Sequence, residues 1–296
     1  MTQKLTLATL NGTPAGDFVA ALANVFEHSP WIAEAAERAR PFVGLADLRT
    51  ALIGVIDNAN PEQRLALINA HPDLANRMQR AAGLTAESTA EQDGAGLDRL
   101  SDAEFALFEQ SNAAYKRKFG FPFVLCVRRH TKDSILDAFA RRLQNRPQHE
   151  KREAIREIGR IATLRLAELV EGDPSLAVNS RLSTHVLDTH AGQPAAGVEL
   201  ELIELSRHGS DRLIAKAVTN VDGRTDRALI EGRPLPIGAY ELRFHIGAYF
   251  ARRGVQLSNP AFLDVVPVRF GVSEPEVHLH VPLLVTPWSY TTYRGS

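Results

Sequence analysis

The 296-residue chain has little cysteine, no long apolar run and almost no net charge, and each of these features excludes a class of protein. A single cysteine, Cys126, excludes an internal disulfide framework and indicates a reducing compartment. No apolar run approaches the roughly 20 residues that a membrane-spanning helix needs. The N-terminal MTQKLTLATLNGTP lacks the long apolar region of a signal peptide. We therefore expect a cytoplasmic protein with no membrane partner.

Opposite charges are nearly balanced along the chain. The 34 Lys and Arg residues against 35 Asp and Glu residues give a formal net charge of −1, which argues against a nucleic-acid partner. The content of 44% hydrophobic and 23% charged residues is that of a globular protein, and the length allows two ordinary domains.

The first part of the chain has a helical pattern. Apolar residues recur at spacings of three and four at Phe18, Leu22, Val25 and Phe26, and again along 155–169. Ser101 followed by Glu104 is a capping-box pattern, which predicts a helix start. We expect an all-helical domain over residues 1–172.

The pattern changes near residue 175. The stretch EGDPSLAVNSR (171–181) contains Gly172, Asp173 and Pro174, which end the last helix, so we predict a linker over 173–181. Beyond it the apolar period is two, as in 198–202, 242–246 and 277–281, with turn sequences between the runs. This predicts an all-β second domain, an antiparallel sandwich over residues 182–296.

Polar residues of the second domain gather in a few short motifs. His278 and His280 point to one face of a predicted strand, and His185 lies in another extended stretch. Arg224 closes a TNVDGR turn, and Tyr293, Arg294 and Ser296 lie at the chain end. Taken alone, a histidine on the outer face of a strand is usually solvated. The three histidines together could instead bind zinc.

The helical domain offers fewer polar candidates. His71 precedes Pro72, which favours extended backbone at a helix boundary. Ser88, Glu91 and Gln92 fit a capping box as well as a site. The apolar FGFPFVLCV run (119–127) is typical of either core or a pocket wall. Arg165 falls on an apolar stripe, where it either reaches water or binds an anion inside, and Arg160 is close by on the same helix.

Motifs of the second domain resemble those of the 5-hydroxyisourate hydrolases, the transthyretin-related enzymes. They are THVLDTHAGQPAAGV, TNVDGR, PVRF, HVPLL and the final YRGS, spread over residues 181–296. The resemblance implies a homotetramer with active sites between subunits, catalysis by His185, Arg224 and His280, and substrate contacts from Tyr293 and Ser296. Transthyretin itself shares this fold but is a carrier, so a carrier with a helical adaptor is the alternative.

Motifs of the first domain resemble those of 2-oxo-4-hydroxy-4-carboxy-5-ureidoimidazoline (OHCU) decarboxylases. They are HPDLA, AESTAEQ, AYKRKFGFPFVLCVRRHTKDSIL and RIATLRL, over roughly residues 12–171. The resemblance implies that His71 donates a proton with Glu91 as its catalytic partner. It also implies that the substrate is held by Pro72, Ser88, Gln92, Phe123, Val124, Leu125, Cys126, Val127 and Arg165.

The chemistry of both families suits these residue types. A neutral imidazole can take a proton from water, and an arginine stays charged and binds planar oxygens. No lysine or glycine-rich motif indicates pyridoxal phosphate, thiamine or flavin, so we expect no cofactor and no metal. The family activities are consecutive, from 5-hydroxyisourate to OHCU and then to (S)-allantoin and carbon dioxide. We therefore predict a bifunctional urate-degrading enzyme with small-molecule substrates.

Overall fold

The chain divides into two compact units. The computed structural model describes residues 5–72, 74, 97, 100–171 and 173–295. One unit comprises Met1–Arg128 with Ile135–Val178, and the other comprises Arg129–Ser134 with Asn179–Ser296. The main division, at 178/179, falls inside the predicted linker. In the described ranges we find no helix long and apolar enough to cross a membrane.

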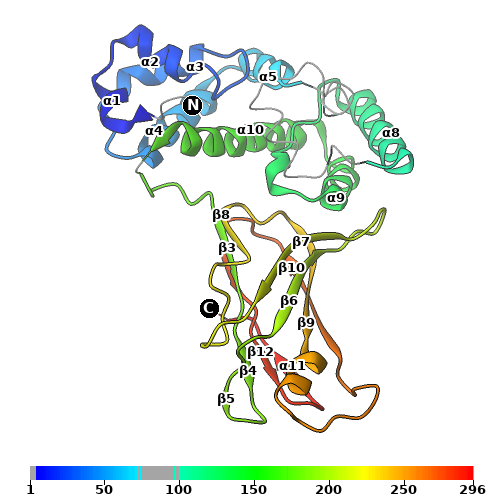
Figure 1. The fold of residues 1–296 in the computed structure, drawn as a ribbon. Coiled ribbons are helices and arrows are strands. Elements are labelled where there is room, and N and C mark those ends of the chain that lie inside the picture. Colours follow the sequence, from blue (N-terminus) through cyan, green and yellow to red (C-terminus); the bar gives the residue numbers. More distant parts are fainter. Residues whose placement is uncertain (1–4, 73, 75–96, 98–99, 172, 296) are drawn as a thin grey trace. The chain divides into compact units, whose positions relative to one another are not determined.

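The first unit is built from helices around one apolar core, as predicted (Figure 1). Its long helix α10 packs against α4 and α5. The described helices are α1 (Leu7–Gly12), α2 (Ala15–Ala21), α3 (Trp31–Ala36), α4 (Leu45–Asn58), α5 (Pro61–Ala70), α8 (Asp102–Phe119), α9 (Lys132–Arg142) and α10 (Pro147–Leu169), with 3-10 turns at Glu37–Ala39 and Val127–Arg129.

The capping box at the start of α8 is confirmed. The Glu104 N–H donates to Ser101 Oγ at 3.3 Å, and the Ser101 N–H donates to Glu104 Oε2 at 2.7 Å. The unit is not purely helical, because β1 (Leu5–Thr6) pairs in parallel with β2 (Val170–Glu171). Two residues on each side are too few for a period-two pattern to show in the sequence.

The second unit is a two-layered β structure with a core between the layers. One layer has the order β10-β9-β6-β7, and the other contains the groups β11-β3-β8 and β13-β12-β4-β5. The strands are β3 (Ser180–Ser183), β4 (Val186–Asp188), β5 (Gln193–Pro194), β6 (Glu199–Glu204), β7 (Arg212–Val218), β8 (Ile230–Arg233), β9 (Gly238–His245), β10 (Val265–Val272), β11 (His278–His280), β12 (Leu283–Val285) and β13 (Tyr290–Thr292).

Two details of the predicted sandwich are wrong. β11 pairs with β3, and β12 with β4, in parallel rather than antiparallel fashion. Alternation of side chains reports the faces of a strand but not the direction of its neighbour, so the sequence could not reveal this. The alternation through residue 246 also runs past the end of β9, because Ile246 begins the short helix α11 (Ile246–Arg252).

Candidate functional sites

In the second unit, the candidate site lies at a break between successive strands: β3 is followed by β4, and their parallel neighbours β11 and β12 are separated at the same level. β3 and β4 are separated by Thr184 and His185, and the parallel strands β11 and β12 are separated at 281–282. The interruption is held by hydrogen bonds: the Thr184 hydroxyl donates to Val281 O at 2.7 Å, and the Leu283 N–H donates to His185 O at 2.9 Å. Ser183 faces His280 in the register. The histidines of the two motifs are thereby brought together.

The TNVDGR turn brings Arg224 to the same place. Arg224 forms an antiparallel bridge with His185, and the Val186 N–H donates to Gly223 O at 2.8 Å. Asn220 Oδ1 accepts the N–H of Arg224 at 3.2 Å, which fixes the turn from within. Gly223 has a φ of 71° and is buried, so this position suits glycine.

The surroundings of both histidines favour the neutral imidazole. Burial and the positive charge of Arg224 lower the pKa of His185. Burial, followed by the charges of Arg224, His185 and His278, lowers the pKa of His280. His185 Nε2 is buried and has no hydrogen-bond partner in the part of the chain that the structure describes. Such an atom is free to accept a hydrogen bond from a bound water or ligand.

A polar pocket opens beside Arg224 and His280, and it is lined in part by Arg181, which the sequence analysis did not single out. Arg181 lies two residues before Ser183 and four before His185, so period-two spacing along the strand could have revealed it. Ser183 Oγ links His278 Nε2 at 3.0 Å to His280 Nδ1 at 2.9 Å. The lining residues are Arg181, Ser183, Thr184, Arg224, Thr225, Ala228, His278 and His280.

The C-terminal tail lies against His280. The Gly295 N–H donates to His280 O at 2.9 Å, and a Cβ on Gly295 would lie 2.5 Å from His280 Cδ2. Tyr293 is 57% exposed and lines a second hollow with His280 and Arg294. Ser296 lies outside the described residues. Among the residues that are described, His, Cys, Asp and Glu form no group of three or more with the spacing of a metal site.

In the helical unit, His71 is the residue at which α5 ends. Its backbone is extended (φ −77°, ψ 133°), as Pro72 predicts, and Leu74 is again helical. The ring is 3% exposed, and Nδ1 lies 2.9 Å from Leu67 O. A carbonyl only accepts, so Nδ1 carries a hydrogen. A small pocket lies beside it, lined by His71, Pro72, Leu74, Phe123, Val124 and Leu125.

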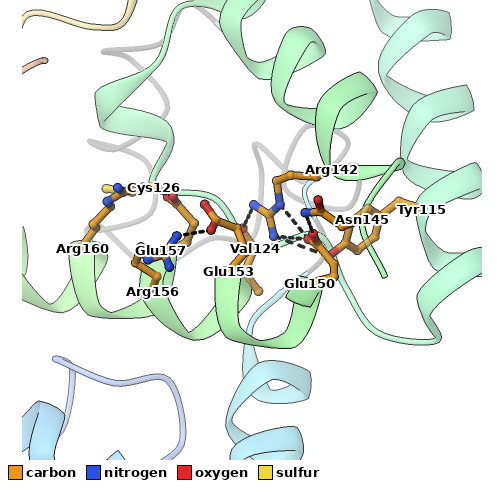
Figure 2. Close-up of polar contacts among 10 residues, drawn as sticks. All are labelled: Tyr115, Val124, Cys126, Arg142, Asn145, Glu150, Glu153, Arg156, Glu157 and Arg160. Carbon is orange, nitrogen blue, oxygen red and sulfur yellow. Dashed lines mark hydrogen bonds and ion pairs between the residues drawn. The ribbon is translucent and has the colours of Figure 1, made fainter. Parts of the chain in front are cut away.

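The 121–127 segment is therefore a pocket wall as well as core. The Cys126 N–H donates to Glu157 Oε2 at 2.9 Å, and Glu157 also pairs with Arg160 (Figure 2). Phe123, Val124 and Leu125 line the pocket beside His71, and Val127 is buried.

Arg165 does reach inward to an anion, but the anion belongs to the chain. It is 9% exposed, and its Nη2 lies 2.8 Å from Glu27 Oε1, while Nη1 donates to Asn24 O at 3.0 Å. Arg165 does not line the pocket beside His71. Ser88, Glu91 and Gln92 lie outside the described residues, so their predicted roles stay predictions.

Two family models divide the chain between them. The model of "OHCU decarboxylase" matches residues 11–167, and that of the "HIUase/Transthyretin family" matches residues 182–295. The chain belongs to both families. The predicted pair of enzymatic domains is thus confirmed, and we call them the decarboxylase domain and the hydrolase domain.

Relatives are found for each domain separately and for both together. The hydrolase domain is 49% identical over 122 residues to 5-hydroxyisourate hydrolase 2 of Rhizobium meliloti, covering 41% of this chain and 100% of the relative. The decarboxylase domain is 41% identical over 165 residues to the OHCU decarboxylase of Haloferax volcanii, covering 56% and 96%. A crystal structure of (S)-allantoin synthase is 34% identical with a TM-score of 0.55, covering 99% of this chain and all of that one.

Proposed function

We propose that the chain catalyses two consecutive steps of urate breakdown. The hydrolase domain opens 5-hydroxyisourate to OHCU, and the decarboxylase domain converts OHCU to (S)-allantoin and carbon dioxide. The relatives of each half and the (S)-allantoin synthase that matches the whole chain support this assignment. The observation that carries it is the buried Nε2 of His185 beside Arg224, which has no hydrogen-bond partner among the residues that the structure describes.

In the hydrolase domain, we assign water activation to the two imidazoles. His185 Nε2 accepts a proton from a water molecule, whose oxygen attacks a ring carbonyl carbon of the substrate. Arg224 binds the carbonyl oxygen on which negative charge develops. The ring C–N bond then breaks, and an imidazolium returns the proton to the leaving nitrogen. His280, held by Ser183, supports His185, while Tyr293 and Ser296 contact the substrate.

In the decarboxylase domain, we assign proton delivery to His71. The bond between the ring carbon and the carboxylate breaks, and carbon dioxide leaves while the substrate ring delocalises the electron pair. The Nε2–H of His71 then gives its proton to that carbon, since Nδ1 is engaged by Leu67 O. Delivery from one face yields one enantiomer. Glu91 orients or charges the imidazole, and Pro72, Ser88, Gln92 and the 123–127 backbone hold the substrate, whereas Arg165, paired with Glu27, supports the fold.

Generating 5-hydroxyisourate with uricase tests both assignments at once. Its decay by absorbance reports the hydrolase, and circular dichroism of the product reports enantioselective decarboxylation. We expect Arg224→Ala to weaken the first signal sharply and to spare decarboxylation of added OHCU. His71→Asn should do the reverse. Wild-type protein that accelerates neither step, or that gives racemic allantoin, contradicts the proposal.

We further propose that the enzyme is a cytoplasmic homotetramer that assembles through the hydrolase domain. Large side chains near the C-terminus are exposed in the single chain: Trp288 by 57%, Tyr290 by 43% and Tyr293 by 57%. Exposed large apolar side chains that gather in one patch are typical of an interface, and these three lie within six residues of one another in the sequence. Sedimentation equilibrium should give four times the chain mass. A monomer at micromolar concentration contradicts the assembly.

A further inference from the structure

The decarboxylase domain contains a fully buried ion pair to which none of the assignments above gives a role. Arg142 at the end of α9 and Glu150 on α10 are both 0% exposed. Arg142 Nε donates to Glu150 Oε1 at 2.7 Å, and Nη2 lies 2.6 Å from the same oxygen. The second carboxylate oxygen accepts Asn145 Nδ2 at 2.6 Å, and the Tyr115 hydroxyl donates to Oε1 at 2.5 Å.

Burial of such a pair is a poor way to gain stability. The desolvation of two charges offsets most of their attraction, and apolar replacements of similar volume are often as stable or more so. Stability therefore does not explain the pair, but the contact of Arg142 with the 121–127 segment does. Arg142 Nη1 donates to Val124 O at 2.7 Å, and the guanidinium lies 4.4 Å from the Phe123 ring centroid.

The bond to Val124 O fixes the direction of a peptide group in the pocket wall. The Val124–Leu125 peptide is trans, so its N–H points opposite to its C=O. With the carbonyl held by Arg142, the Leu125 N–H points away from Arg142. Glu157 acts likewise on the next peptide, because its carboxylate accepts the Cys126 N–H (Figure 2). That peptide is also trans, so Leu125 O points away from Glu157.

These contacts leave the N–H and C=O of Leu125 facing away from the groups that hold the segment. The residue is 4% exposed and lines the pocket beside His71, yet within the described residues its N–H and C=O make no hydrogen bond. Buried backbone groups without partners are rare in proteins. A donor and an acceptor side by side match an amide or ureide edge, as in strand pairing.

We propose that Arg142 and Glu150 are positioning residues of the decarboxylase site, which aim the Leu125 peptide groups at the ureide edge of the substrate. The inference rests on the proposed decarboxylase function. It assigns no chemical step to the pair, because Arg142 acts only through the Val124 carbonyl.

The decisive variant replaces both charges with apolar side chains, Arg142→Met with Glu150→Leu. We expect a 10- to 100-fold lower kcat/KM for OHCU, carried mainly by a higher KM, because a mis-aimed hydrogen-bond pair weakens binding. A purely structural role would lower the fraction of active enzyme and leave KM unchanged. The matched control is Arg156→Met with Glu153→Leu, which removes another α10 ion pair that holds no carbonyl of the segment. It should keep the wild-type KM.

A second measurement covers the case in which the double variant does not fold. In wild-type protein, adding allantoin should shift the Leu125 amide resonance, and Arg142→Lys should reduce that shift, because one ammonium cannot serve both Glu150 and Val124 O. A wild-type KM in a folded double variant, or a Leu125 amide that is unmoved by allantoin in active wild-type protein, overturns the proposal. Wild-type protein that fails to decarboxylate OHCU would instead refute the proposed function.

Discussion

Replacing Gly223 with alanine should damage the hydrolase site far more than the same change at Gly232. The two glycines have nearly the same left-handed backbone, with φ of 71° and 72°. A Cβ at Gly232 meets nothing within 4 Å. A Cβ at Gly223 would lie 2.3 Å from Val186 O and 3.2 Å from His185 Cδ2. The pair therefore separates backbone strain from steric overlap.

The expected magnitudes follow from that difference. The left-handed conformation costs an alanine about 1–2 kcal/mol at either position. Overlap adds about 1–3 kcal/mol at Gly223 alone, since Val186 O is held by the Ala195 N–H and cannot move freely. Each kcal/mol lowers the Tm of a domain this size by roughly 4 °C. Gly223→Ala should therefore melt about 4–12 °C below Gly232→Ala.

Activity should separate the two variants further. A shift of Gly223 moves His185 and Arg224 relative to each other, and a misplacement near 1 Å costs roughly 100-fold in rate. Differential scanning calorimetry and the decay of 5-hydroxyisourate measure the two effects, and decarboxylation of OHCU by the same chain serves as internal reference. Equal Tm values and equal hydrolase rates for the two variants would refute the reasoning.

Three further outcomes are expected. Arg224→Ala removes a positive charge that lowers the pKa of His185 and of His280, so both pKa values should rise. Titration of the two imidazoles by NMR measures this, and unchanged pKa values would contradict the electrostatic coupling to Arg224. As the pH is lowered, the residual hydrolysis rate of this variant should begin to fall at a higher pH than the wild-type rate does. Gly295→Ala should lower hydrolase kcat/KM at least tenfold, because the added Cβ pushes His280 aside. An unchanged rate would mean that the tail moves instead and would contradict this prediction. His71→Gln should abolish enantiomeric excess in the allantoin formed, and a persistent excess would assign the proton to another group.

Local patterns predicted the features that depend on near neighbours. Alternation placed His278 and His280 on one strand face, and the turn predicted at TNVDGR is present, closed by the Gly223 N–H that donates to Asn220 O at 2.9 Å. Both follow from geometry over a few residues. Strand direction in the second layer depends on where the chain returns after many residues, so the parallel pairs could not be foreseen.

Charged residues inside the helical domain were the least predictable feature. Arg142 and Glu150 lie in a stretch rich in Arg and Glu that resembles a solvated helix face, and only the packing of distant segments buries them. Arg165 was placed correctly on an apolar face, but its partner Glu27 lies 138 residues away. No spacing rule connects residues so far apart, because tertiary folding alone brings them together.

The segment between the two domains also stabilises the decarboxylase domain, because it caps helix α4. Gly44 supplies no side-chain cap to α4, and the start of that helix is capped from the linker: Asp173 Oδ2 accepts the Leu45 N–H, and Ser175 Oγ accepts the Ala46 N–H at 2.9 Å. Such caps are worth about 0.5–2 kcal/mol each. A gene cut at codon 172 would thus release a weakened decarboxylase, whereas a cut after Val178 keeps both caps. Fission or recombination of this fused gene should accordingly tolerate breakpoints near 178 and disfavour those only six codons earlier.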